Sequence, residues 1–314
     1  MTESTKDLYA GLVTAKKRRG FLADLVYRFI KEKPLGTIGA IIVLLLLFVG
    51  IFANWLAPYG YNDTFVGGKL EAPSTHFWMG TDNVGRDLLS RIIYGARVSM
   101  FVGLGASAIG VALNAIIGLV SGYIGGKTDL IIQRFVDAWV CFPFLFILLT
   151  FMALIGSGLI QVIIVLGVAG GIAGSRLMRS AVIAVKHNLY VEAARAIGSP
   201  TWLVLLKHIL PNVMAPMIIM FTMGIGGSIL AEASISFLGY GIPPPAPSWG
   251  GMLSGNSRRY MVEAPWLAIW PGVALSIVVY GANMFGDALR DLLDPRLRGG
   301  LGRYSGGKPK KLKN

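Results

Sequence analysis

The sequence predicts an all-α integral membrane protein with six transmembrane helices and with both termini in the cytoplasm. Of the 314 residues, 54% are hydrophobic and only 14% are charged, whereas about a quarter of the residues in soluble domains are charged. Long stretches lack Asp, Glu, Lys and Arg altogether, and the basic residues gather on alternate connecting segments. These observations exclude a disordered chain and disfavour a soluble enzyme.

The charge-free stretches locate the helices. They cover residues 34–62, 98–126, 138–175, 208–231 and 264–286. Because about 20 helical residues cross a bilayer core about 30 Å thick, the third stretch is long enough for two helices, and Gly156-Ser157-Gly158 interrupts it. Six spans are therefore expected near residues 36–56, 98–122, 136–155, 159–175, 213–237 and 266–286.

The basic residues set the orientation. If the N-terminus lies inside, the inner segments 1–34, 123–137, 176–212 and 287–314 carry 23 of the 29 Lys and Arg residues. The outer segments 57–97 and 239–265 carry the other 6. Since basic residues collect on the cytoplasmic side, both termini are expected in the cytoplasm. The net charge of +13 then indicates topology and attraction to anionic membrane lipid, and we expect no binding of nucleic acid.

Two basic cytoplasmic segments flank the six-span domain 35–290. Within segment 1–34, apolar residues recur at helical spacing over 21–33 among Arg and Lys, which predicts an amphipathic helix on the cytoplasmic membrane face. The first span is too long for the apolar region of a secretory signal, and no clear cleavage site follows it, so we expect it to be retained. Residues 291–314 form a basic cytoplasmic tail.

The sequence offers no catalytic residue, metal site or cofactor site. Cys141 is the single cysteine, and His76, His187 and His208 show no metal-ligand spacing. No G-x-S-x-G motif is present. The nearest approach to a phosphate-binding loop, at 121–128, lacks the first glycine and follows a membrane helix rather than a strand. We therefore expect this chain not to be an enzyme and not to hydrolyse ATP itself.

Glu232 is an acidic residue near the outer end of the fifth span, where a carboxylate is costly. It could contact a substrate or a coupling ion, or it could make a hydrogen-bonded contact between helices, which we favour. An ion-coupled secondary transporter that uses Glu232 is the alternative class of function. That class predicts inverted repeats and several intramembrane carboxylates, whereas the chain shows one such acid and no evident repeat.

The inner loop 187–212, between spans 4 and 5, predicts two short helices. Gly198 suits the C-terminal cap of the first helix, and Ser199 with Pro200 suits the N-cap and first position of the second. Pro211 marks the start of the next span. Such a loop forms a rigid projection to which a partner protein can bind. The alternatives are a DNA-binding helix-turn-helix, which is unexpected between two spans, and a simple connector.

The residues of this loop resemble a known signature. Glu192-Ala193-Ala194, three further residues, Gly198, nine residues and then His208-Ile-Leu-Pro211-Asn resemble the EAA loop of permease subunits of binding-protein-dependent ABC importers. The outer segments 76–99 and 232–250 resemble the second, "C"-type permease of the dipeptide, oligopeptide and nickel branch. The resemblance covers about residues 21–298, and the Ser199-Pro200 pair departs from it.

The resemblance implies a complex in a prokaryotic plasma (inner) membrane. The partners would be a second homologous permease, two cytoplasmic ABC ATPases that bind ATP and Mg, and an extracytoplasmic substrate-binding protein. The loop 187–212 would couple the chain to a groove on one ATPase. The residues implied in this coupling are Glu192, Ala193, Ala194, Gly198, Ser199, Pro200, His208 and Pro211.

The outer loops 57–97 and 239–265 are the expected docking surfaces for the binding protein, with Trp249 as an exposed aromatic anchor. The docking residues are Asp82, Arg86, Asp87, Pro244 and Trp249. Alternatively, the loops plug or brace the outer end of the bundle. The resemblance favours peptides as substrate and leaves nickel chelates, glutathione-like thiols, opines and some sugars open.

Overall fold

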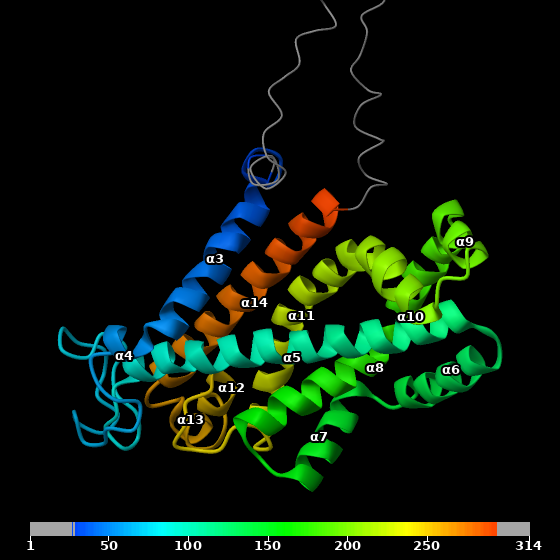
Figure 1. Ribbon diagram of the computed structural model, residues 1–314. Coiled ribbons are helices and arrows are strands. Elements are labelled where there is room, and N and C mark those ends of the chain that lie inside the picture. Colours follow the sequence, from blue (N-terminus) through cyan, green and yellow to red (C-terminus); the bar gives the residue numbers. More distant parts are fainter. Residues whose placement is uncertain (1–26, 28, 294–314) are drawn as a thin grey trace, which may run out of the picture.

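A computed structural model describes residues 27 and 29–293 of the chain (Figure 1). Within these residues the secondary structure is helical, no strand forms, and one isolated bridge joins Thr81 and Asp87. Of the amphipathic helix expected at 21–33, residue 27 and residues 29–32 are helical, and the rest lies outside the described residues. Most of the basic tail 291–314 also lies outside them. The all-helical class is therefore confirmed for the described part of the chain.

Five helices are long and apolar enough to cross a membrane. They are α3 (Pro34–Ile51), α5 (Leu88–Ile124), α8 (Leu159–Lys186), the run of helical turns that ends in α11 (Met214–Phe237), and α14 (Trp266–Leu293). The short α4 (Ala53–Leu56) extends α3. Five of the six expected spans are therefore present as single long helices or continuous helical runs.

α5 begins well before the expected start of the second span. Its N-cap is Asp87, whose carboxylate accepts hydrogen bonds from the backbone N–H of Ser90 at 2.8 Å and from its hydroxyl at 2.6 Å. Arg91 and Arg97 thus lie on the helix and not in an outer loop. α8 likewise continues beyond residue 175 to Lys186. The outer segment 57–97 is consequently a loop only over residues 57–87.

The third expected span, a single helix over 136–155, is wrong. The structure has α6 (Gly126–Val140) and α7 (Phe144–Ile155), which meet at an angle of 89°. Pro143 is the N-cap of α7, and proline has no N–H with which to continue the preceding helix. The 12 residues of α7 rise only about 18 Å, less than the bilayer core. α6 and α7 therefore form a bent helix pair and not one straight span.

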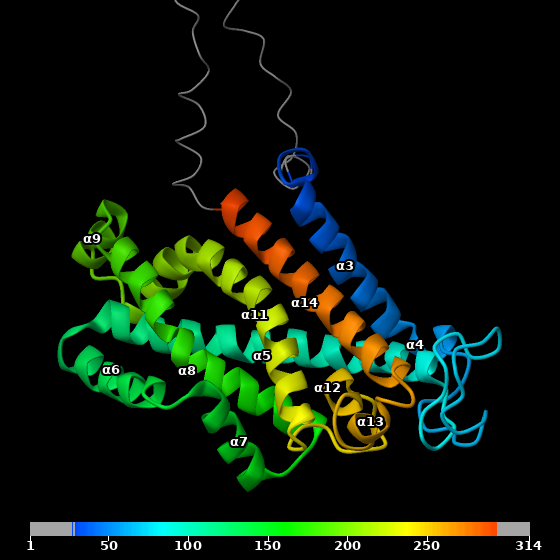
Figure 2. The same ribbon diagram turned by 180° about the vertical axis from the view of Figure 1, so that it is seen from behind.

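Glycines let α5 and α8 pack closely along most of their length, side by side in Figures 1 and 2. A Cβ added at Gly118 would lie 2.6 Å from Met178, and one added at Gly171 would lie 2.7 Å from Leu113. Toward the C-terminal end of α8, Arg179 donates to both carboxylate oxygens of Asp129 of α6, at 2.7 and 2.5 Å. This ion pair holds α6 against α8.

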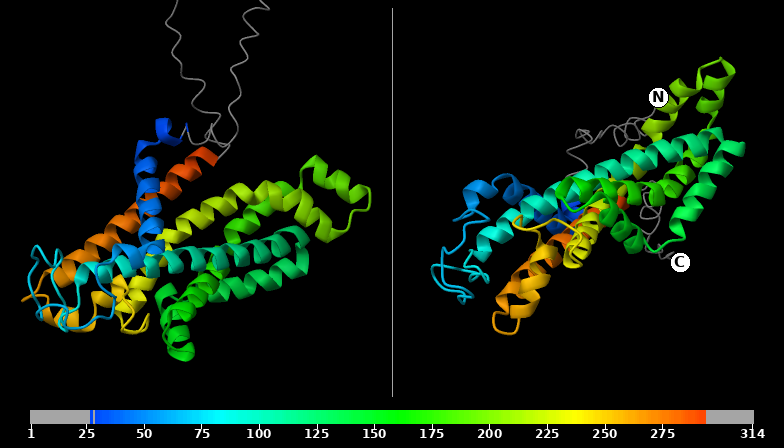
Figure 3. Two further views of the ribbon diagram at one scale, coloured as in Figure 1. Left: turned by 60° about the vertical axis from the view of Figure 1, so that its left-hand side comes forward. Right: turned by 90° about the horizontal axis from the view of Figure 1, so that it is seen from below.

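The remaining helices form a second group in which α14 packs between α3 and α11. Lys33, the N-cap of α3, pairs with Asp291 in the last turn of α14 at 2.5 Å. The start of α3 and the end of α14 therefore lie at one end of the bundle, together with α9 (Leu189–Ala196), as Figures 1 and 3 show. The loop 57–87, α12 (Trp249–Met252) and α13 (Gly255–Tyr260) lie at the opposite end.

Candidate functional site at the two ends of the bundle

The inner loop folds as a compact segment of short helices between α8 and α11. After α9 come α10 (Thr201–Val204), a π-helical turn η1 (Leu205–Ile209) and a 3₁₀ turn η2 (Leu210–Val213), which leads directly into α11. We call residues 189–213 the α9–η2 segment. The two expected short helices are present, although the second continues without a break into the span. Pro211 lies at the start of η2, where its missing N–H breaks no bond.

The turn between the short helices depends on Gly198. Its φ is +82°, in the left-handed region that favours glycine. Gly198 N–H donates to the carbonyl of Arg195 at 2.9 Å, and Ser199 N–H donates to that of Ala194 at 3.1 Å, which is the Schellman pattern. The expected C-cap is therefore confirmed.

The expected capping of the second helix by Ser199 is wrong by one residue. Pro200 is the N-cap of α10, and its carbonyl accepts from the N–H groups of Leu203 and Val204 at 3.0 and 3.1 Å. No side chain caps this helix. Ser199 instead belongs to the preceding turn, because its N–H completes the cap of α9.

The inner face of the α9–η2 segment packs on the inner ends of α5 and α8. Val191, Ala194, Val204 and Ile209 are buried there, against Leu119, Tyr123, Met178 and Val182 among others. Arg195 donates from Nε to the hydroxyl of Tyr123 at 3.0 Å, and its guanidinium lies over the Tyr123 ring. The prediction that Ala194 offers a contact surface to a partner is thus wrong, because its side chain packs inside its own chain.

The outer face of the segment carries large apolar side chains. Leu189 and Ile197 are each 83% exposed and Trp202 is 62% exposed. Most of the predicted coupling residues lie beside them: Glu192, Ala193, Gly198, Pro200 and Pro211 are exposed, and Ser199 and His208 are half-buried. Exposed apolar groups that gather on one projection mark an interaction surface. The sequence analysis missed these three residues. The signal that could have found them is the presence of large apolar side chains on the otherwise polar side of a short helix.

At the opposite end, the predicted docking acids hold the outer loop in place. Asp82 accepts hydrogen bonds from Val84 N–H at 2.9 Å and from Arg86 Nε at 2.7 Å. Asp87 caps α5, and both acids are buried. Arg91 reaches back from α5 to the carbonyl of Tyr61 at 2.9 Å. These contacts support the alternative that the loop braces the outer end.

Trp249 is not the exposed anchor that the sequence analysis expected. It is 2% exposed, and its indole N–H donates to the carbonyl of Ile92 at 3.1 Å. The indole fills the space that a side chain at Gly95 would need, since a Cβ there would lie 2.6 Å from the indole nitrogen. Among the predicted docking residues, Pro244 is exposed. Among the exposed aromatic residues near this end, Trp55, Phe65 and Trp78 are the most exposed.

Glu232 is buried near the outer end of α11 and takes part in a local hydrogen-bond network. Its carboxylate accepts from the Ser236 hydroxyl at 2.6 Å, and that hydroxyl accepts from Ile242 N–H at 3.2 Å. The carboxylate therefore helps to fix the chain where it leaves α11. These bonds lie within α11 and the turn after it, and not between helices as the favoured interpretation expected. Among the described residues, no group of three or more His, Cys, Asp or Glu side chains could hold a metal ion.

Comparison with known families identifies most of the chain. Residues 114–299 match the model of the binding-protein-dependent transport system inner membrane component. Residues 20–73 match the N-terminal transmembrane domain of oligopeptide transport permease C. The two matches include α3 and every described helix beyond α5.

Three relatives show the same relationship over nearly the whole chain. The dipeptide transport system permease protein DppC of Alkalihalophilus pseudofirmus is 37% identical over 87% of this chain and 89% of its own. The glutathione transport system permease protein GsiD is 39% identical in Escherichia coli, over 87% and 90% of the two chains. GsiD of Pectobacterium atrosepticum is 38% identical over 86% and 90%.

Apolar helices, short inner helices and these matches lead to one conclusion. The permease subunits of this family are not catalytic, and ATP hydrolysis belongs to their partner ATPases. The chain is a multi-pass inner membrane protein. It belongs to the binding-protein-dependent transport system inner membrane components, as a DppC/OppC-like permease of an ABC importer.

Proposed function

We propose that this chain forms half of an ATP-driven import pathway for short peptides or peptide-like solutes. The relatives named above are permeases for dipeptides and for glutathione, which is itself a tripeptide with amide bonds. Nickel chelates are the alternative substrate class, and neither relative named above is described as a nickel permease. The partners are a second homologous permease, two ABC ATPases that bind ATP and Mg, and an extracytoplasmic binding protein.

The α9–η2 segment is the surface through which the ATPases drive the chain. The observation that carries this proposal is the exposure of Leu189, Ile197 and Trp202 on a projection whose other face is firmly packed. Buried at an interface, such side chains become the hot spots of binding. Glu192 and Ala193 lie on the same projection and contribute to the contact.

The end that carries the α9–η2 segment lies in the cytoplasm. The segments expected inside carry most of the Lys and Arg residues, and basic residues are retained on the cytoplasmic side. The start of α3 and the end of α14 share that end. This orientation places both termini inside and directs the loop 57–87 toward the binding protein.

The outer end serves as the docking surface for the binding protein. Asp82, Arg86, Asp87 and Trp249 brace it from within, whereas Pro244 and Trp78 are exposed on it. The contact with the partner is therefore assigned to the exposed residues, and the buried ones act by holding the loop in place.

An ion-coupled mechanism at Glu232 is not favoured by the geometry. The carboxylate is nearly fully buried and holds Ser236 in its network. It serves as a structural acceptor at the end of α11. The family of the chain also assigns the driving force to ATP hydrolysis in partner subunits.

Site-directed cross-linking tests the coupling surface. Cys141, the single and exposed cysteine, is first replaced by Ser, and Ile197→Cys is introduced in the complete complex in native membranes. A short thiol-to-amine cross-linker should join Ile197→Cys to an ATPase, because exposed apolar side chains of this kind are buried when the partner binds. The matched control is Val262→Cys, which is also highly exposed but lies at the opposite end. Equal yields at the two positions, or no ATPase adduct at Ile197→Cys, would overturn the proposal.

A further inference from the structure

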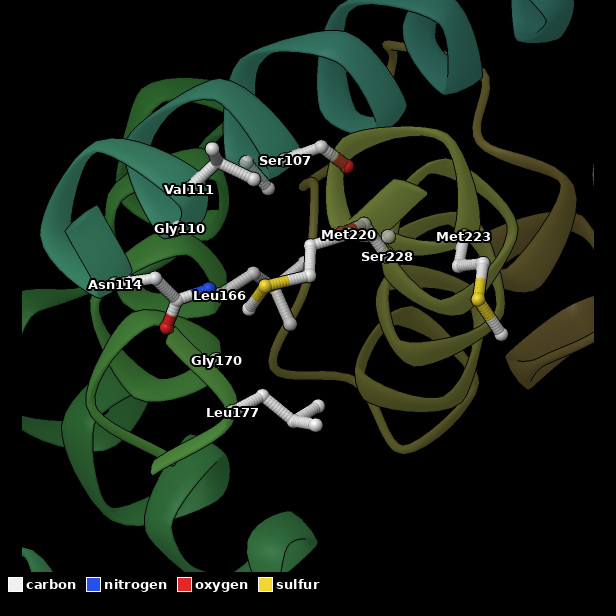
Figure 4. A pocket seen from close by; sticks show the side chains of 12 residues that line it. Ser107, Gly110, Val111, Asn114, Leu166, Gly170, Leu177, Met220, Met223 and Ser228 are labelled. Carbon is white, nitrogen blue, oxygen red and sulfur yellow. The ribbon is translucent and has the colours of Figure 1, made fainter. Parts of the chain in front are cut away.

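Two hollows of similar size lie along the helices. One, of about 340 Å³, lies between α5, α8 and α11, with Ser107, Asn114 and Met220 among its lining residues (Figure 4). We call it the central pocket. The other, of about 320 Å³, lies where α6 meets α7. We call it the elbow groove, and unlike the central pocket it is formed by one bent helix pair alone.

Aromatic side chains form most of the elbow groove. Five of them, from both helices and the break between the helices, line it: Phe135, Trp139, Phe142, Phe146 and Phe151. The rings of Trp139 and Phe151, from α6 and α7, have centroids 5.7 Å apart. Phe142 and Phe146, whose rings stack at 6.5 Å, are 57% and 58% exposed. The groove is therefore open on the surface of this chain, and its lining favours an apolar occupant over water.

The bent helix pair lies on the return path across the membrane, because α5 and α8 run in the same direction. Gly105 of α5 packs on Ile163 near the start of α8. Further along both helices, Gly118 packs on Met178. Both helices are long and apolar enough to cross, so the segment that connects them must return to the opposite side. Neither α6 nor α7 alone, at about 22 and 18 Å, is as long as a core of about 30 Å. The break at residues 141–143 is therefore placed within the core.

Backbone groups at this break have no partner in the chain itself. Phe144, Leu145 and Phe146 carry the first N–H groups of α7, and none of these groups has an acceptor within residues 29–293. In the same part of the chain, the carbonyls of Val140 and Cys141 accept no hydrogen bond. All five residues are exposed. Because acyl chains cannot pair with such groups, irregular backbone at membrane depth is tolerated only against protein or water.

Lipid and water each suit only one of these two features. Acyl chains would fill the aromatic groove but leave the backbone groups of the break unpaired. Water would pair with the backbone groups but gain nothing from the aromatic rings. A protein helix suits both, because it carries apolar side chains for the groove and hydroxyl or amide side chains that bond across helices. The protein that shares the membrane with this chain in the proposed complex is the second homologous permease.

We propose that the elbow groove is a contact surface for the second permease, which inserts an apolar side chain beside Phe142 and Phe146 and pairs polar side chains with the backbone of residues 141–146. This inference rests on the proposed function and locates one part of the interface between the two permeases. α6 is held to its own α8 by the ion pair of Arg179 and Asp129. The bend thus lies between an attachment within this chain and an attachment to its neighbour.

Photo-cross-linking in the complete complex tests which neighbour covers the groove. p-Benzoylphenylalanine is placed at Phe142 or Phe146, or at the control position Leu44, which is 63% exposed on the unbroken α3. After illumination in native membranes, the two groove positions should give adducts that mass spectrometry identifies as the second permease, several-fold above the yield at Leu44. Adducts with lipid alone, or equal yields at all three positions, would overturn the inference.

Alanine substitution measures what the groove contributes to assembly. Phe142→Ala removes a groove ring that is exposed in this chain, so its membrane abundance should equal that of the wild type. The matched control is Phe144→Ala, which removes a ring that is 44% exposed and does not line the groove. Recovery of the second permease with the tagged chain in mild detergent should fall about tenfold in Phe142→Ala and little in the control. Equal recovery with both variants, or loss of Phe142→Ala itself from the membrane, would contradict the proposal.

Cys141, the single cysteine, lies at the break and reports whether water reaches it. In the complete complex, a charged methanethiosulfonate reagent should modify Cys141 far more slowly than Val262→Cys in a Cys141→Ser background, since Val262 is 89% exposed outside the spans. Rapid modification of Cys141 would show a water-filled passage at the elbow, and the proposed contact would be wrong.

Failure of the proposed function would give a different result. If the wild-type chain is recovered with no second permease at all, the proposed complex is wrong and the elbow contact is wrong with it. If the wild type carries its second permease while probes at Phe142 and Phe146 reach only lipid, the elbow contact alone is wrong.

Discussion

The guanidinium of Arg195 lies 4.4 Å from the ring centroid of Tyr123, and its Nε donates to the Tyr123 hydroxyl at 3.0 Å. Arg195 belongs to α9, and Tyr123 is in the last turn of α5. The helix that would receive a push from the ATPases is thus tied to the helix that contributes Ser107 and Asn114 to the central pocket.

Removing this tie should uncouple the complex. Arg195→Ala deletes a cation–π contact and a hydrogen bond that together contribute about 1–2 kcal/mol. We expect ATP hydrolysis to continue while uptake per ATP falls several-fold in reconstituted vesicles. Tyr123→Phe keeps the ring and removes only the hydroxyl, so its effect should be smaller. Equal effects from the two variants would show that the ring contact contributes nothing.

Gly198 should tolerate only residues that accept a left-handed backbone. A side chain there meets no atom within 4 Å, so the cost comes from φ alone. We expect Gly198→Val to distort the turn and to lose transport, at a cost of about 1–2 kcal/mol, without preventing insertion. Gly198→Asn should retain most transport, because Asn populates this region. Membrane abundance and uptake measure the two effects, and normal import by Gly198→Val would refute the coupling role of the turn.

Trp249 should matter for stability and not as a contact for the binding protein. Trp249→Ala leaves a cavity and removes the indole hydrogen bond to the Ile92 carbonyl, and should cost about 3–5 kcal/mol. A lowered thermal midpoint in detergent would report it. Trp78→Ala is the control, since Trp78 is 72% exposed at the same end. It should leave the midpoint unchanged and weaken binding of the binding protein, and the reverse pattern would restore Trp249 as the anchor.

Glu232 should be replaceable by its amide. Glu232→Gln retains an oxygen that accepts from the Ser236 hydroxyl, so we expect transport close to that of the wild type, with no dependence on proton or sodium gradients. Glu232→Leu leaves that hydroxyl without its acceptor and should destabilise the fold by about 1–3 kcal/mol. Loss of uptake in Glu232→Gln, with stimulated ATP hydrolysis intact, would instead show that the carboxylate handles substrate or an ion.

The sequence predicted the positions of the five long apolar helices, because hydropathy follows directly from the residues that face lipid. The sequence analysis failed where a charged side chain on one helix forms hydrogen bonds with another helix. Arg97 looked like a loop residue, yet its Nε donates to the carbonyl of Gly50 at 2.8 Å from within α5. The bend at Pro143 was missed because two apolar helices give one continuous charge-free stretch whatever the angle between them.

The candidate site was predicted in its position and only partly in its residues. The motif located the inner loop. The role of Gly198 in the turn could be predicted because a positive φ favours glycine. The direction of each side chain depends on which face of a two-turn helix packs against α5 and α8, and periodicity over so few residues does not decide this. Ala194 was therefore assigned to the wrong face, and Ile197 and Trp202 were overlooked.

The glycine seam between α5 and α8 gives the central pocket walls of unequal stiffness. Backbone rests on backbone or Cβ along that seam, as at Gly118 and Gly171, so the two helices offer few rotamers through which to separate. α11 faces the pocket with methionines, which change shape at little cost. We therefore expect α11, and not the α5–α8 pair, to move when the pocket changes shape.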